Sequence, residues 1–360
     1  MHHGIWDHDI PCAPILVDIT LNGRTIKAVA QPTKQAFLYV FDRVTGQPIW
    51  PIEERPVAKG DVPGEWYSPT QPFPTKPPAY DRQGSSIDDL INFTPELRAE
   101  AVKLVSRYKL GPIFTPPVVS KVEGPLGTLQ QAINNGGTVW EGGSYDPETH
   151  TVYVFSTTTM NSLSLLPSDG KRSDMKYIQG NALSGVRSGG GSGAGAGADA
   201  APAPAVAGEG GGGGNPPLTI QGLPLARPPW GRITAINMDR GEIVWQIAHG
   251  ETPDNVRNHP ALKGLTIPRT GRPGRIGTLV TKTLVVAGEG GFFTTPSGQR
   301  GAMLRAYNKA TGNEVGAVYM SAPQTGSPMT YMLNGRQYIV VAISGAAYSG
   351  EYVAFRLPAS

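Results

Sequence analysis

Cysteine is nearly absent from this sequence, since Cys12 is the single one among 360 residues. A single cysteine cannot form an internal disulfide or a cysteine-rich metal site, and no Cys-x-x-Cys-His sequence is present to attach a haem. Charge is also scarce, with 16% charged residues and a formal net charge of +3, which argues against a nucleic-acid partner. No apolar run approaches the roughly 20 residues of a membrane-spanning helix, so we expect no membrane span in this chain.

Glycine and proline, by contrast, are abundant, with 47 and 34 residues respectively. Part of this excess is a Gly/Ala-rich tract at 188–216, which we expect to be a disordered insertion because it has too little apolar surface to bury. The rest of the chain stays rich in both residues and has few helical patterns. Such a composition favours many turns and many short strands, and therefore an all-β fold.

Repeats organise these short strands. Asn-Gly pairs at 22–23 and 334–335 each separate two strand-like runs, which predicts two type I′ hairpins. An eleven-residue pattern, in which Asp or Asn is followed by a turn glycine and then by Trp in two of three copies, occurs at 40–50, 235–245 and 306–316. Internal repeats of short strands indicate a β-propeller of four-stranded antiparallel blades.

We assign four units to this propeller. Their residues are 13–50, then 138–158 with 228–247, then 274–318, and finally 326–358. Residues 51–135 are interpreted as a Pro-rich and helical excursion within one partial propeller domain that spans 1–360. Its one clear helix is predicted to have Thr94 as the N-cap and Pro95 in the first position.

Three residues are candidates for chemistry. Asp7 follows Trp6, which can desolvate a carboxylate and raise its pKa; the alternative is a strand start with solvated acids. Lys34 could hold an oxyanion or a carbonyl oxygen, or it could simply be solvated. Trp140, followed by small residues, could stack on a flat ligand or could be a core residue between blades. The histidines near the N-terminus fit no common zinc spacing, and no metal ligands are assigned.

Four stretches of the sequence indicate a particular protein family, which composition alone cannot do. They are residues 2–11, 32–34 with 41–43, 67–73, and 327–331. Together they resemble the quinoprotein dehydrogenases, which use pyrroloquinoline quinone (PQQ), and most of all the C-terminal half of the membrane-bound glucose dehydrogenase type. The eleven-residue pattern resembles the tryptophan-docking motif of that family. The resemblance implies an eight-bladed ring, of which this chain holds about four blades.

The resemblance also implies roles for the candidate residues. Asp7 stands at the position of the general base, Lys34 at that of the residue that hydrogen-bonds the quinone oxygens, and Trp140 near the cofactor. Hydride transfer from an alcohol carbon to a quinone needs a base for the hydroxyl proton and a cation for the charge that develops on oxygen. Calcium is implied as a second cofactor, with its ligands expected in an N-terminal half that this chain lacks.

Further expectations follow from the family: a sugar or alcohol substrate, a quinone electron acceptor such as ubiquinone, and a periplasmic, membrane-associated location. Because the sequence opens abruptly, we expect half of a ring that binds PQQ poorly and is inactive by itself. Two positions depart from the family, Glu141 in place of a frequent Gly and Gly316 in place of the docking Trp. The alternatives are a non-catalytic propeller scaffold or assembly protein, and a non-functional gene fragment; the presence of Asp7, Lys34 and Trp140 together favours the enzyme.

Overall fold

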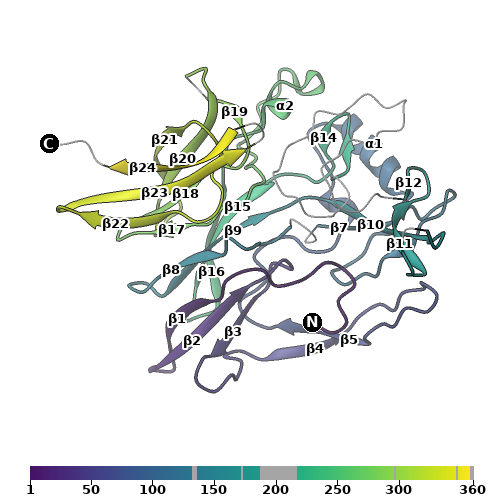
Figure 1. The fold of residues 1–360 in the computed structure, drawn as a ribbon, viewed down its shortest axis with the longest axis horizontal. Coiled ribbons are helices and arrows are strands. Elements are labelled where there is room, and N and C mark those ends of the chain that lie inside the picture. Colours follow the sequence, from purple (N-terminus) through teal and green to yellow (C-terminus); the bar gives the residue numbers. More distant parts are fainter. Residues whose placement is uncertain (132–135, 172, 187–216, 296, 346–347, 357–360) are drawn as a thin grey trace.

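The computed structural model of the protein describes residues 1–131, 136–171, 173–186, 217–295, 297–345 and 348–356 (Figure 1). The tract at 188–216 therefore lies outside the described residues. Strands dominate the described part, as the composition predicts. The helical elements are α1 (Pro95–Val105), α2 (Asp254–Arg257) and the 3₁₀ turns η1 (Ile87–Asp89) and η2 (Pro260–Leu262).

Four antiparallel sheets correspond to the four predicted units (Figure 1). The first contains β1 (Ile15–Leu21), β2 (Arg24–Pro32) and β3 (Leu38–Asp42). The second has the order β16 (Glu242–Ala248), β15 (Gly231–Asn237), β9 (Thr151–Thr157) and β8 (Gly143–Asp146). The third consists of β17 (Leu279–Val280), β18 (Leu284–Gly288), β20 (Arg300–Asn308) and β21 (Glu314–Met320), with β19 (Phe293–Thr294) also on β20. The fourth consists of β22 (Met329–Leu333), β23 (Arg336–Gly345) and β24 (Tyr348–Arg356).

The second sheet confirms that two distant segments build one unit, because β9 pairs with β15 along seven residue pairs. The first and fourth sheets differ from the expectation of four strands, since each has three among the described residues. In the first sheet the expected outer strand is reduced to a single bridge between Phe41 and Pro48. This bridge is held by hydrogen bonds on either side of Pro48, from Asp42 N to the carbonyl oxygen of Gln47 at 2.8 Å and from Ile49 N to that of Val40 at 2.9 Å.

The turns form as the sequence predicts. Both residues of each Asn-Gly pair have positive φ, with 51° and 75° at Asn22 and Gly23, and 50° and 73° at Asn334 and Gly335. These are the backbone angles that a type I′ hairpin requires. In the three-copy pattern the carboxylate or amide oxygen accepts bonds from the turn N–H groups; Asp42 Oδ1, for example, accepts from Val44 N at 2.8 Å.

Each docking tryptophan packs on the turn glycine of the next unit. A Cβ on Gly241 would lie 3.0 Å from Cζ2 of Trp50, and a Cβ on Gly312 would lie 2.9 Å from Cε3 of Trp245. Trp245 also donates from Nε1 to the carbonyl oxygen of Lys309 at 3.1 Å. Glycine is therefore required in these two turns both for its positive φ and for the close approach of an indole.

Apolar side chains fill the space between successive sheets. Strand β9 is buried along its whole length and alternates, with Val152 and Val154 in the core against the first sheet and Tyr153 and Phe155 in the core against the third. A separate core joins the third and fourth sheets. This period-two alternation on a central strand is what places one residue set in each interface.

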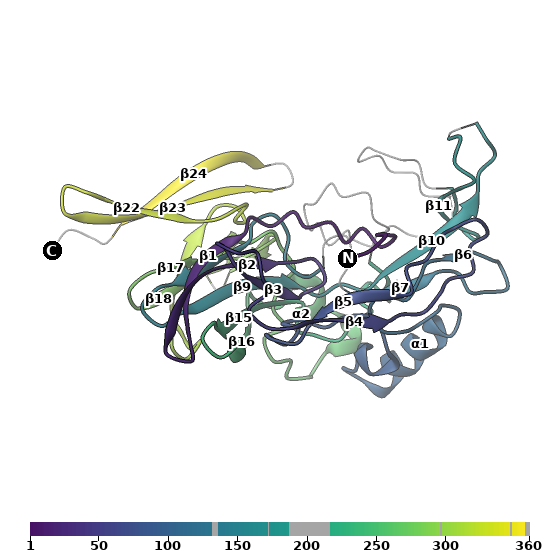
Figure 2. The same cartoon turned by 90° about the horizontal axis from the view of Figure 1, so that it is seen from below.

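A second group of elements lies beside the propeller sheets. It contains the hairpin of β4 (Ile52–Pro56) and β5 (Thr70–Pro74), the sheet of β6 (Val118–Val119), β7 (Thr128–Gln130), β10 (Asn161–Pro167), β11 (Tyr177–Asn181) and β12 (Gly185–Val186), and the pair β13 (Thr219–Ile220) and β14 (Leu223–Pro224). Figures 1 and 2 place β10 and β11 at the opposite end of the long axis from β22–β24.

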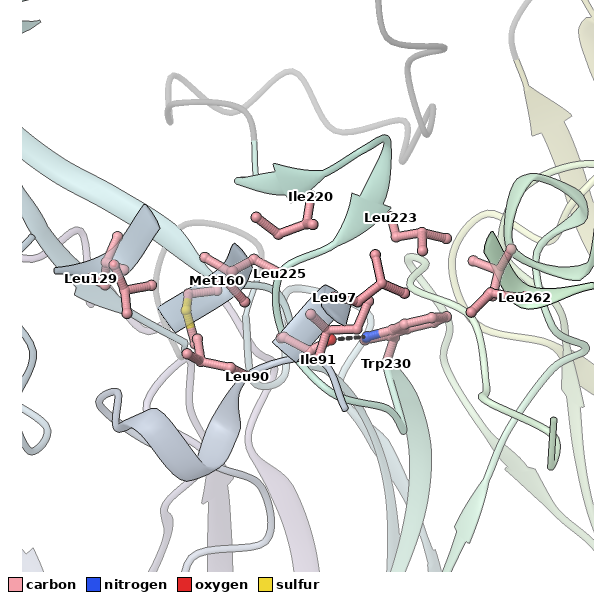
Figure 3. Close-up of a cluster of buried hydrophobic side chains, with 14 residues drawn as sticks. Leu90, Ile91, Leu97, Leu129, Met160, Ile220, Leu223, Leu225, Trp230 and Leu262 are labelled. Carbon is pink, nitrogen blue, oxygen red and sulfur yellow. Dashed lines mark hydrogen bonds between the residues drawn. The ribbon is translucent and has the colours of Figure 1, made fainter. Parts of the chain in front are cut away.

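Helix α1 belongs to this second group. Thr94 is the N-cap, as predicted, and its side chain accepts from Leu97 N at 3.2 Å. The apolar face of the helix packs into a core with residues that come from distant parts of the chain, including Trp230, which donates to the carbonyl oxygen of Ala226 (Figure 3). The excursion is therefore joined to the propeller by a shared core.

Candidate functional site

The first fourteen residues contain no strand, so the strand start in the alternative interpretation of Asp7 is wrong. Its solvated acids are present, since the side chains of Asp7 and Asp9 are 54% and 59% exposed. This segment is fixed by side chains along its length. The backbone N of His2 donates to Gln71 Oε1 at 2.8 Å, and buried Trp6 donates from Nε1 to the carbonyl oxygen of Thr115 at 2.8 Å. Cys12 is buried, with Sγ 2.9 Å from the carbonyl oxygen of Val139. The segment is thus held where its acidic side chains face the end of β2.

Lys34 follows β2 and has a buried side chain, which excludes the solvated alternative. Its Nζ lies 3.6 Å from Asp7 Oδ2 and 3.3 Å from the carbonyl oxygen of Asp7. The same ammonium donates to Asp9 Oδ1. Asp7 has a φ of 59°, in the left-handed region that Asp tolerates better than most residues. The structure therefore brings two of the predicted site residues, Asp7 and Lys34, into direct contact.

The two acids around Lys34 differ in basicity. The Asp7 side chain is 54% exposed, and its partial burial raises its pKa; the nearby charge of Asp9 adds to this, while the positive charge of Lys34 only partly offsets it. Burial also tends to raise the pKa of Asp9. The hydrogen bond from Lys34 and its positive charge outweigh this effect, so the pKa of Asp9 is lowered. Asp7 is thus the better proton acceptor of the two, and Asp9 is the anionic partner of the lysine.

Trp140 lies on a loop next to the lysine turn. Thr138 of this loop donates from its backbone N to the carbonyl oxygen of Thr33 at 3.2 Å. The Trp140 side chain is 47% exposed, so the alternative of a core tryptophan is wrong. One edge of the indole approaches Gly326, where a Cβ would lie 3.3 Å from Cη2. The result is an open indole surface close to the turn that carries Lys34.

Two acidic residues of the site were not singled out from sequence. The only sequence signal for Asp9 is that it is a second acidic residue two positions after Asp7. Glu141 is noted in the sequence as a departure, yet it is buried, and its Oε1 has no hydrogen-bond partner among the described residues. Burial raises the pKa of Glu141 to about 7. Its backbone oxygen accepts from Ser327 Oγ at 2.8 Å, which ties this loop to the start of the fourth sheet.

A cavity of about 340 Å³ opens beside Asp7. It lies between the N-terminal segment and the β10–β11 sheet. Its lining consists of Ile5, Asp7, Pro117, Leu163, Ser164, Leu165 and Gln179. No local sequence signal marks Gln179, because only the pairing of β10 with β11 brings it here.

No metal cluster accompanies this arrangement: within the described ranges, no three His, Cys, Asp or Glu side chains are grouped closely enough to hold a metal ion. The helices of the described chain are all too short or too polar to cross a bilayer.

Comparison with known proteins identifies the family. Residues 1–339 match the family model described as "PQQ: Glucose/ethanol/alcohol dehydrogenase, beta-propeller domain". A quinoprotein glucose dehydrogenase of Escherichia coli K12 is 30% identical over 373 residues, covering 99% of this chain and 42% of that protein. A glycerol dehydrogenase large subunit of Gluconobacter thailandicus is 31% identical over 376 residues, covering 99% of this chain and 46% of that protein. The chain thus spans less than half the length of these relatives.

Similar relatives also differ in the substrate that they are named for. A quinate/shikimate dehydrogenase (quinone) of Acinetobacter baylyi is 30% identical over 360 residues, covering 98% of this chain and 41% of that protein. Among solved structures, a quinohemoprotein alcohol dehydrogenase of Pseudomonas putida HK5 has a TM-score of 0.49 and 15% identity, covering 96% of this chain and 36% of that chain. Because the family model matches nearly the whole sequence, the chain belongs to the PQQ-dependent glucose, ethanol and alcohol dehydrogenase β-propeller family.

Proposed function

We propose that this chain provides the base and the quinone-binding lysine of a PQQ-dependent dehydrogenase that oxidises a sugar or alcohol hydroxyl. The observation that carries the proposal is the contact of Asp7 with buried Lys34, beside the exposed indole of Trp140, in a member of this family. The relatives are named for glucose, glycerol and quinate or shikimate. All of these carry a hydroxyl on a carbon that can lose a hydride.

The side chains at the site are of the types that could bind PQQ. A planar quinone can stack on the open face of Trp140, and Lys34 supplies the ammonium for its oxygens. Glu141, which follows Trp140 in the chain, has a buried carboxyl oxygen with no hydrogen-bond partner among the described residues and a pKa of about 7, so its protonated form can donate a hydrogen bond to a bound group. Bound PQQ supplies the hydride acceptor that no amino-acid side chain provides.

The proton step belongs to the protein. Asp7 accepts the hydroxyl proton of the substrate, and its raised pKa makes it a stronger base than an ordinary carboxylate. Lys34 holds the carbonyl oxygen of Asp7 and binds Asp9, which fixes the base against the end of β2. We further propose that calcium ligands come from residues outside this sequence, that a quinone such as ubiquinone accepts the electrons, and that the protein works in the periplasm.

The first test measures PQQ binding to the 360-residue chain. Quenching of tryptophan fluorescence reports the binding. We expect weak, saturable quenching that Trp140→Ala and Lys34→Gln reduce. Trp66→Ala is the matched control, because Trp66 is also exposed, at 58%, and its ring packs edge-on against His3. Equal effects of the Trp140 and Trp66 variants would contradict the placement of the cofactor. Stoichiometric binding to the isolated chain would overturn the expectation that it binds PQQ poorly.

The second test is turnover of glucose and glycerol at saturating PQQ and calcium, in whatever longer protein or complex supports activity. We expect Asp7→Asn to lower kcat by about 10²- to 10⁴-fold, the usual contribution of a general base, with PQQ binding retained. An active Asp7→Asn variant would refute the role of Asp7.

A further inference from the structure

We propose that the cavity beside Asp7 selects uncharged polyols of about one sugar ring, and that Gln179 binds a second hydroxyl of the substrate. The inference rests on the proposed function for the role of Asp7 as the base. Gln179 is a specificity-determining residue in this proposal and takes no part in the proton step.

The position of Gln179 follows from strand register. Gln179 of β11 lies opposite Leu165 of β10, and residues directly opposite in an antiparallel pair share one face of the sheet. Leu163, two residues earlier on β10, is on that same face and packs against the buried cluster that contains Trp6. The face that carries Gln179 is therefore the one turned toward the N-terminal segment and its Asp7.

The walls of the cavity suit a ring that has apolar and polar parts. Ile5, Pro117, Leu163 and Leu165 form an apolar lining that can contact the C–H groups of a sugar ring. The volume of about 340 Å³ lies at the small end of ligand pockets. The amide of Gln179 offers both a donor and an acceptor to a hydroxyl. A substrate that places one hydroxyl at Asp7 can therefore place another at Gln179.

The charged groups at the cavity further limit the class of substrate that it can bind. Among the residues that the structure describes, the lining contains one carboxylate, Asp7, and no Lys or Arg. The nearby cation, Lys34, is already shared by Asp7 and Asp9. A substrate carboxylate would meet the carboxylate of Asp7, and none of the described lining residues is a cation that could pair with it. Desolvating an unpaired charge is costly. A short monohydric alcohol, on the other hand, has no second hydroxyl for Gln179 and gains nothing from it.

The experiment measures dissociation constants by calorimetry or ligand-detected NMR on the 360-residue chain without PQQ. The probes are glucose, quinate, glycerol and ethanol. Gln179→Met keeps the side-chain length and removes both polar atoms, while Gln299→Met is the control at an exposed turn on another sheet. We expect glucose to bind more tightly than quinate. We also expect Gln179→Met to weaken glucose binding by about two- to tenfold, the value of one hydrogen bond, and to leave ethanol unchanged.

Tighter binding of quinate than of glucose would overturn the proposal, as would equal glucose affinities for the wild type and Gln179→Met. Circular dichroism of the variant verifies that it is folded; if Gln179→Met is not, Gln179→Ser replaces it in the same comparison. A different result would refute the proposed function while leaving the pocket assignment intact. If glucose binding depends on Gln179 but no PQQ-dependent oxidation occurs in any assembly, the pocket assignment stands and the dehydrogenase assignment falls.

Discussion

Replacement of Gly312 by Ala tests whether docking of a tryptophan on the turn glycine stabilises the contact between units. The three-copy pattern contains its own control. Gly46 and Gly312 occupy the same position of the turn, with φ of 75° and 74°. A Cβ on Gly46 would meet nothing within 4 Å, whereas on Gly312 it would meet Trp245 at 2.9 Å and Ile247 at 3.0 Å.

The two substitutions share one cost and differ in the other. An alanine in the left-handed region costs about 1–2 kcal/mol at either site. Forcing an extra methyl group into a packed contact adds about 1–3 kcal/mol, and only Gly312 has such a contact. We therefore expect Gly46→Ala to lower the free energy of unfolding by about 1–2 kcal/mol and Gly312→Ala by about 2–5 kcal/mol.

Urea unfolding, followed by tryptophan fluorescence, provides the measurement. A second comparison is made in a Trp245→Ala background, where the extra cost of Gly312→Ala over Gly46→Ala should shrink but not vanish, because Ile247 still contacts the added methyl group. Equal destabilisation by the two glycine substitutions in the wild-type background would refute the reasoning. It would mean that both lose stability only from the left-handed backbone conformation and that the packed contact at Gly312 costs nothing.

Two further predictions concern charge. The pKa of Glu141 is about 7 in the folded chain against an ordinary value of 4.5, so the fold favours the protonated form. The wild type should therefore lose up to about 3 kcal/mol of stability as pH rises from about 5 through 7, and Glu141→Gln should not; urea titrations at several pH values measure this. Lys34→Gln should raise the pKa of Asp7 further and should also raise that of Asp9, since Lys34 lowers both; ¹³C NMR titration of the carboxyl groups measures this.

Matched controls exist for both charge predictions. Glu123 and Lys27 are exposed, so Glu123→Gln should leave the pH dependence of stability unchanged and Lys27→Gln should leave the Asp7 titration unchanged. Parallel pH–stability curves for the wild type and Glu141→Gln would contradict the buried-acid interpretation. An Asp7 titration that does not move in Lys34→Gln would show that the contact in the structure has no electrostatic effect.

Local features of the fold could be predicted from sequence because their causes are local. The Asn-Gly hairpins need only two residues that tolerate positive φ, and helix α1 begins where Thr94 and Pro95 predict because an N-cap acts within one turn. The repeat also predicted which units would form. The reduction of the first sheet's outer strand to a single bridge was not foreseen.

The site was predictable in part. Asp7 and Lys34 were proposed by resemblance, and the structure places them in contact, while their roles stay predictions. The identity of the lysine's second partner, Asp9, was missed, because the path of the N-terminal segment depends on anchors such as Gln71 and Thr115. Whether Trp140 is buried or open was likewise undecided until its loop was placed.

Sequence alone therefore determined the turns, the helix start, the repeated units and the family, since each depends on residue types at fixed, short spacings. Tertiary structure decided which groups are desolvated and which meet. The pKa of Glu141 is raised by its burial in the folded chain, and Gln179 reaches the cavity of Asp7 through the pairing of β10 with β11. Burial and strand pairing join residues that are far apart in the chain, so no local pattern of side chains encodes them.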